Sequence, residues 1–253
     1  MLPYFCGMEA FSISLPKSWS ELSDKQLRFF FGQVARDLPM NEVLALCLCK
    51  WAKVTVICRA DEHSTYVRHK RLKFQIPDWQ ITYATRKLAF LESFPPYPVR
   101  ISHMGGAQAV DADLQGMTFE YYLACENYYQ GFLHTKKYEC LDDMAHLLYP
   151  ALSDTYKLSK AELVSVLYWY AAIKTNFTQN FPHLFSSVPD SDRNLLGEDM
   201  AKQLRSVMNA QIRALTGGDI TKENEVLQMN CWRALTELDA KVQEAQELRN
   251  QLK

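Results

Sequence analysis

The most constraining feature of this sequence is a helical pattern near its end, which follows a break at Gly217 and Gly218. Apolar residues recur there at alternating intervals of four and three, so they share one side of an α-helix. Thr221 can cap the start, and the pattern predicts one long helix over residues 221–250. The stripe consists of Cys231, Leu235, Leu238, Val242, Ala245 and, after Arg249, Leu252. Such a stripe packs on another helix rather than on a sheet.

The stripe is short, because Arg249 interrupts it after about two and a half heptads, and a helix of that size is marginal alone in water. It must therefore dock, either on its own chain or on another protein, and the sequence leaves both open. A long terminal helix with a one-sided stripe is typical of assembly elements. We predict a protein interface formed by Trp232 as the large anchor with Leu235, Leu238, Val242 and Ala245.

The rest of the chain predicts a mainly α fold, a multi-helix domain with a small N-terminal β-hairpin and the long C-terminal helix. Capping boxes at Ser23 and Gln26 and at Ser159 and Glu162 each open a helix. Residues 93–115 form a connector with at most a short strand at 99–102, between an N-terminal α+β region (1–92) and an all-helical region (116–253). The other predicted elements are strands at 11–15, 54–58 and 65–74, and helices at 42–51 (capped by Asn41), 79–90, 118–133, 139–148 and 194–215.

The cysteines and the net charge limit the class of protein. Seven cysteines are scattered without a Cys-x-x-Cys pair, which is typical of reduced thiols in a cytoplasmic protein. The formal net charge is −1, so the whole molecule has no bias toward nucleic acid or membranes. No stretch reaches the ~18 apolar residues of a membrane span, and the N-terminus lacks a signal-peptide pattern. Met8 is a candidate start that would leave residues 1–7 as a leader. We expect a cytoplasmic protein.

The predicted helix that follows Ser159 carries three consecutive aromatic residues, Tyr168, Trp169 and Tyr170. Neighbours on a helix point about 100° apart, so these rings cannot all face one core. Either the helix is buried on several sides within its own domain, or some rings form a subunit interface. The pattern favours burial on several sides.

Residues 50–73 are strongly basic, with seven lysines and arginines against Asp61 and Glu62, a local balance of +5. A basic β-hairpin can lie along a phosphate backbone, because each cation displaces a counterion. The competing interpretation is a solvated strand face whose charges prevent edge-to-edge aggregation. The near-neutral whole chain favours the second, so nucleic acid binding is an alternative function. Its candidate contacts are Arg68, Lys70, Arg71 and Lys73.

A metal-dependent enzyme is the third possibility. Asp143 and His146 are three residues apart, which places both on one face of a helix, and Glu126 and Glu162 are the acids best placed to assist them. An acid at 143 also suits a first helical turn without any metal. The sequence contains no nucleophile elbow, phosphate loop, dinucleotide fingerprint or zinc-protease motif. We therefore predict no enzymatic activity, no catalytic residue and no cofactor.

Four segments spread over most of the chain carry a family resemblance: LPKSWSELSDKQL, PPYPVR, QGMTFEYYL with YYQGFL, and LTGGDITKENEVLQMNCWRALTELDAK. They are similar to proteins encoded by prophages of Bacteroidetes-type bacteria, in late gene clusters for virion tails. The resemblance transfers no site residue. It implies a tail assembly chaperone-like or tail structural protein, in the bacterial host cytoplasm or the virion. Together with the stripe, it predicts a non-enzymatic assembly protein that binds a protein partner or itself through the C-terminal helix.

Overall fold

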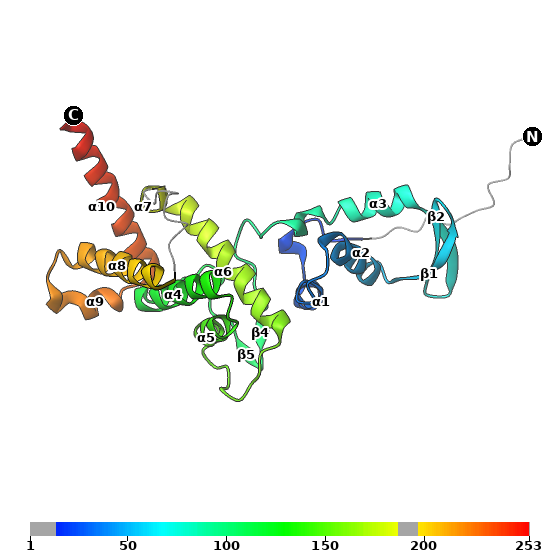
Figure 1. Ribbon diagram of the computed structural model, residues 1–253, viewed down its shortest axis with the longest axis horizontal. Helices are drawn as coiled ribbons and strands as arrows, with labels where there is room; N and C mark the ends of the chain where they lie inside the picture. Colours follow the sequence, from blue (N-terminus) through cyan, green and yellow to red (C-terminus); the bar gives the residue numbers. More distant parts are fainter. Residues whose placement is uncertain (1–13, 187–196, 253) are drawn as a thin grey trace, which may run out of the picture.

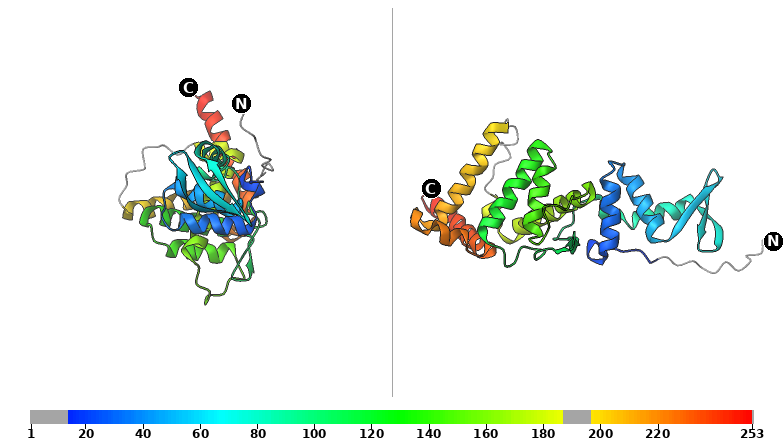
Figure 2. Two further views of the ribbon diagram at one scale, coloured as in Figure 1. Left: turned by 90° about the vertical axis from the view of Figure 1, so that its right-hand side faces the viewer. Right: turned by 90° about the horizontal axis from the view of Figure 1, so that it is seen from below.

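The computed structural model describes residues 14–186 and 197–252. The molecule is mainly helical and elongated, with a three-stranded sheet near one end and the C-terminal helix at the other (Figures 1 and 2). This confirms the predicted fold class. Within the described ranges, none of the helices has the length and apolar character needed to cross a bilayer. Met8, Asn194 and most of the strand predicted at 11–15 lie outside the described residues.

The N-terminal part begins with a short 3₁₀ helix and two α-helices and continues into the sheet. The capping box at Ser23 is confirmed, because its hydroxyl accepts from the Gln26 N–H while the Gln26 side chain accepts from the Ser23 N–H. The cap predicted at Asn41 is wrong, since the helix starts at Met40, two residues before the predicted start, with Pro39 as its N-cap. The elements are η1 (Trp19–Glu21), α1 (Asp24–Val34), α2 (Met40–Trp51), β1 (Val54–Asp61), β2 (Ser64–His69), β3 (Leu72–Pro77), α3 (Asp78–Arg86) and η2 (Ala89–Glu92).

The sheet is an antiparallel meander in the order β1-β2-β3. The single strand predicted at 65–74 is wrong, because Lys70 and Arg71 form a turn that divides the run into β2 and β3. Arg68 of β2 then lies directly opposite Lys73 of β3. A three-stranded meander therefore replaces the predicted hairpin.

The C-terminal part is helical apart from one small hairpin. Thr118 caps α4, since its side chain accepts from the Tyr121 N–H. The capping box of Ser159 and Glu162 is confirmed at α6. The elements are β4 (His103–Met104), β5 (Ala107–Gln108), α4 (Phe119–Thr135), α5 (Glu139–Leu148), α6 (Lys160–Asn180), α7 (Pro182–Ser186), α8 (Gly197–Thr216), η4 (Ile220–Lys222), α9 (Glu223–Leu227) and α10 (Cys231–Gln251).

Two predicted boundaries in this part are wrong. The strand expected at 99–102 is irregular backbone. The β4–β5 hairpin follows it and turns at Gly105 and Gly106 with φ of +55° and +86°. The final helix does not start after Thr221 but at Cys231, where the Asn230 side chain accepts from two backbone N–H groups. Residues 221–230 hold shorter helical turns instead.

One hydrophobic core runs from Trp19 to Leu238. Helix α1 packs on α6, so N-terminal and C-terminal helices share this core. The role of residues 93–115 as a connector between two regions stays a prediction. The three consecutive rings of α6 point to different neighbours. The ring of Tyr168 packs against Trp19 and Phe31, the ring of Trp169 against Tyr149, and the ring of Tyr170 against Tyr129. Helix α6 is thus buried on several sides, as its sequence favours.

An ion pair joins α1 to α6. Arg28 Nη1 lies 3.2 Å from Oε1 of Glu162, and the Tyr156 hydroxyl donates to the same oxygen at 3.0 Å. The Ser159 N–H and hydroxyl donate to Oε2 at 2.9 and 2.8 Å. Burial acts to raise the pKa of Glu162, but the hydrogen bonds from Ser159, Tyr156 and Arg28 outweigh it, so the pKa lies below its usual value.

The lowered pKa predicts an acid-dependent loss of stability. Ionised Glu162 stabilises the fold above its unfolded-state pKa of about 4.5, and this contribution is lost as the pH falls through the lower folded-state pKa. The variant Glu162→Gln lacks this titration, so it should be less stable than wild type near neutral pH and should lose less stability on acidification. Urea unfolding of both proteins at neutral and acidic pH measures this. Parallel pH profiles would contradict it.

Candidate interaction surfaces

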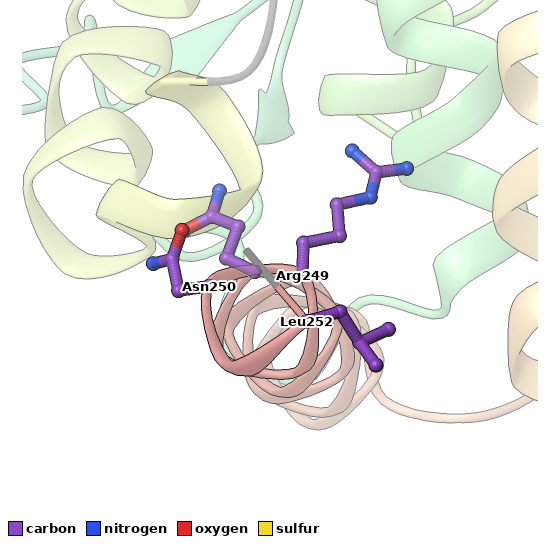
Figure 3. A pocket seen from close by; sticks show the side chains of 4 residues that line it. Arg249, Asn250 and Leu252 are labelled. Carbon is purple, nitrogen blue, oxygen red and sulfur yellow. The ribbon is translucent and has the colours of Figure 1, made fainter.

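Two hollows in the described part of the molecule are poorly suited to a substrate. A shallow, open hollow of about 460 Å³ lies beside Gln246, Arg249, Asn250 and Leu252 at the end of α10 (Figure 3). A second one, of about 170 Å³ beside Arg28 and Glu162, is smaller than typical ligand pockets, which enclose roughly 300 Å³ or more. The first hollow is large enough, but it is too open to surround a ligand. Neither hollow therefore suits a bound small molecule.

The predicted metal residues do not gather further ligands. Asp143 is exposed and His146 is half-buried on α5. Among the described residues, none forms a hydrogen bond with the Nδ1 atom of His146. Within residues 14–186 and 197–252, no three His, Cys, Asp or Glu side chains come together as a metal site would require. Asp143 and His146 therefore remain a pair, which is fewer ligands than zinc or di-iron sites use.

The first half of α10 is docked in the core of its own chain. Leu235 and Leu238, both predicted interface residues, are 0% and 2% exposed. Trp232 is half-buried, packs edge-on against Phe177 at 5.4 Å between ring centroids, and donates its indole N–H to the Asp113 carbonyl at 2.8 Å. This half of the predicted stripe is thus covered by residues of the same chain.

Backbone hydrogen bonds fix the base of α10. The Phe119 N–H donates to the Met229 carbonyl at 2.8 Å, and the Cys231 N–H donates to the Met117 carbonyl at 2.9 Å. Farther along, the Asp239 carboxylate accepts from the Leu184 N–H at 2.8 Å. Helix α10 is therefore held to the start of α4 at its base and to α7 at its middle.

The second half of α10 projects beyond the body (Figure 1). Val242 is half-buried and Ala245 is exposed, while Leu248 and Leu252 are 61% and 81% exposed. Figure 3 looks along this end and shows Leu252 and Asn250 pointing away from each other. Val242 and Ala245 of the predicted interface thus lie in a part of the helix that the chain itself leaves largely uncovered. We call residues 242–252 the distal arm.

The predicted stripe did not include Leu248. After Ala245 it used a spacing of four, which leads to Arg249 at that turn. Ala245, Leu248 and Leu252 follow each other at i, i+3 and i+7, which is also one face of a helix. Choosing a spacing of three after Ala245 would have identified Leu248.

The sheet at the other end is covered on one face of its central strand β2 and open on the other face of that strand. Thr65 and Val67 of β2 are 6% and 2% exposed, whereas the alternating residues Tyr66 and Arg68 are exposed. Alternate residues of a strand point to opposite faces, so Tyr66, Arg68 and the opposed Lys73 share the open face. Figure 2 (left) looks onto the sheet from this end of the molecule.

The four predicted nucleic-acid contacts lie close together on this sheet. Arg68 and Lys73 form a cross-strand pair, and Lys70 and Arg71 form the turn between their strands. All four are exposed. They make a cationic end of the sheet, whose role stays a prediction.

Comparison of the chain with protein-family models, with curated proteins and with solved structures found no match. The resemblance to prophage tail proteins therefore stays a prediction as well.

Proposed function

We propose that this chain is a non-enzymatic assembly protein that binds an apolar groove of another protein through its distal arm. The observation that carries the proposal is the division of α10 into a docked half and an exposed half. Leu235 is fully buried, while Leu248 and Leu252, on the same helix, are 61% and 81% exposed. Large exposed apolar side chains on a rigid projection mark interaction sites.

The pattern of the arm favours a groove as the binding partner. Ala245, Leu248 and Leu252 have the i, i+3, i+7 spacing by which helices anchor in apolar grooves. If the stripes of two copies of this chain paired with each other, the surface area buried would be far less than the roughly 800 Å² per partner of a stable interface. A groove covers more of the helix and avoids this limit. The acids Glu244 and Glu247 on the arm disfavour an anionic membrane surface.

The proposed role agrees with the resemblance to prophage tail-cluster proteins. Tail assembly requires a protein that contacts other proteins, and a groove-binding arm supplies such a contact. A place in the bacterial cytoplasm or in the virion is part of the same proposal.

The test is the mass of the complex formed with the products of neighbouring genes. Leu248→Asp with Leu252→Asp should abolish the complex, because two buried carboxylates without partners are costly in an apolar groove. The variant should remain folded, since both side chains are exposed. Gln243→Asp with Asn250→Asp adds the same charge on the opposite side of the arm and should leave the complex intact. Light scattering after size exclusion measures the masses.

Two results would contradict the proposal. A complex that survives Leu248→Asp with Leu252→Asp would show that the arm is not its contact. A purified chain that already forms a dimer, and becomes monomeric in this variant, would assign the arm to self-association instead of groove binding.

A further inference from the structure

The sheet end of the molecule concentrates positive charge. Residues 50–87 contain nine lysines and arginines but three acidic residues, in a chain whose net charge is −1. The remainder of the chain is therefore acidic, and the excess positive charge belongs to the sheet and the segments beside it. Such a segregated basic surface attracts polyanions.

One of the nearby acids forms an ion pair with a cation, and another accepts hydrogen bonds from neutral donors. Asp78 lies 2.8 Å from Nη1 of Arg59, and Asp61 accepts from the Gln75 amide at 2.8 Å and from the His63 N–H at 2.8 Å. The third, Glu62, lies in the β1–β2 turn at the opposite end of the strands. In the described part of the chain, no ion pair involves the four cations at the other end, which are Arg68, Lys70, Arg71 and Lys73.

The arrangement of these cations is unfavourable for the isolated fold. Arg68 and Lys73 are directly opposed across β2 and β3, and like charges in that position destabilise a sheet. Protection of a sheet edge explains Lys73 on the edge strand β3, but β2 is the central strand, where Arg68 has no edge to protect. Edge protection therefore does not account for the pair.

The turn adds a second cost. Lys70 has φ of +53°, a conformation that favours glycine or asparagine and costs a side chain such as lysine about 1 kcal/mol or more. The chain thus keeps two adjacent cations, Lys70 and Arg71, at a position where an Asn-Gly turn would be less strained. An anion close to Arg68 and Lys73 would offset the repulsion between these two cations.

An aromatic ring lies beside these cations. Tyr66 is two residues from Arg68 on the same open face and is 43% exposed. A ring next to cations on an open sheet face is suited to stack an unpaired base while the cations hold the flanking phosphates. In a duplex the bases are stacked on one another, so the ring would contribute little.

We propose that the open face of the β1-β2-β3 sheet binds single-stranded nucleic acid. A base stacks on Tyr66, and the phosphates lie along Arg68, Lys73 and the turn of Lys70 and Arg71. This site is at the opposite end of the molecule from the distal arm (Figure 1), and it does not depend on the assembly function proposed above.

Binding of the purified full-length chain to a fluorescent single-stranded oligonucleotide, followed by anisotropy, tests the proposal. With four phosphate contacts, the logarithm of the binding constant should fall with the logarithm of salt concentration with a slope of about −3. Arg68→Glu with Lys73→Glu should weaken binding about tenfold or more. Lys137→Glu with Lys157→Glu changes the net charge equally at two exposed positions far from the sheet, and it should leave binding close to wild type.

The stacking contact is tested separately with the same probe. Tyr66→Ala should weaken binding about fivefold or more, because the ring is lost, while Tyr66→Phe should retain it. A circular dichroism melt of each variant confirms that it is folded. A duplex of the same length should bind more weakly than the single strand and should be insensitive to Tyr66→Ala.

Four results would overturn the proposal. Absence of oligonucleotide binding at low salt would exclude it outright, and so would equal weakening by the Lys137 and Lys157 control. Equal binding of duplex and single strand, with no effect of Tyr66→Ala, would indicate a general polyanion surface. Binding to phosphatidylglycerol vesicles but not to oligonucleotides, lost in Arg68→Glu with Lys73→Glu, would assign the face to membranes.

Discussion

Leu235→Ala should lower the free energy of unfolding by about 2–5 kcal/mol, the usual cost of deleting a buried leucine side chain in a core that cannot fully collapse. Leu235 is fully buried where α10 enters the core. The matched change Leu248→Ala, on the same helix but 61% exposed, should alter stability by no more than about 0.5 kcal/mol.

Urea unfolding monitored by circular dichroism measures both values, because each variant changes the same residue type in the same helix. The difference between them reports where docking ends along α10. If Leu235→Ala and Leu248→Ala had equal effects, then α10 would not be docked in the core, and the assignment of the distal arm would fail with it.

Glu126→Ala should lower the free energy of unfolding by about 3 kcal/mol, which is the lower end of the cost of breaking a buried ion pair. Glu126 on α4 is 8% exposed, and its carboxylate accepts from Lys174 at 2.9 Å and from the Tyr170 hydroxyl at 3.2 Å. Burial first, and then the charge of Glu126, hold the pKa of Tyr170 well above its usual value, so its hydroxyl remains protonated and donates.

The loss arises because Glu126→Ala leaves Lys174 and the Tyr170 hydroxyl without their acceptor. The lower end applies because the Lys174 side chain is 24% exposed and can be partly hydrated. The double variant Glu126→Met with Lys174→Met removes both charges and should recover much of the stability. Equal destabilisation by the double and single variants in urea unfolding would contradict an ion pair between α4 and α6.

The sequence predicted the elements whose signals are local. Ser23 with Gln26, and Ser159 with Glu162, are capping boxes within four residues, so neither depends on the rest of the fold. The start of α10 was missed for the opposite reason. Thr221 and Asn230 are both acceptable N-caps. Asn230 caps α10 because it pairs with Thr118 in an isolated antiparallel β-bridge, and Thr118 is far away in the sequence. Such long-range pairing leaves no periodic signal in the sequence.

The β2–β3 turn was missed because its residues are poor turn formers. Lys70 and Arg71 continue a basic, β-favouring run, and nothing in the run indicates that Lys70 adopts a positive φ. The candidate surfaces were predicted only in outline. The four cations were identified by charge, but their joint placement depends on the strand register. The stripe of α10 was identified by spacing, yet spacing cannot tell Leu235, which is covered, from Leu252, which is not.

The division of α10 also determines geometry at a distance. Residues 231–251 contain neither glycine nor proline, so the docked and projecting halves form one stiff rod without a hinge. At 1.5 Å of rise per residue, Leu252 lies roughly 20 Å along the axis from Leu238, the last buried leucine. A protein held at the tip would therefore have a set spacing and a set rotation relative to the body. If the distal arm binds a partner as proposed, helix α10 also fixes the distance between that partner and the body of the molecule.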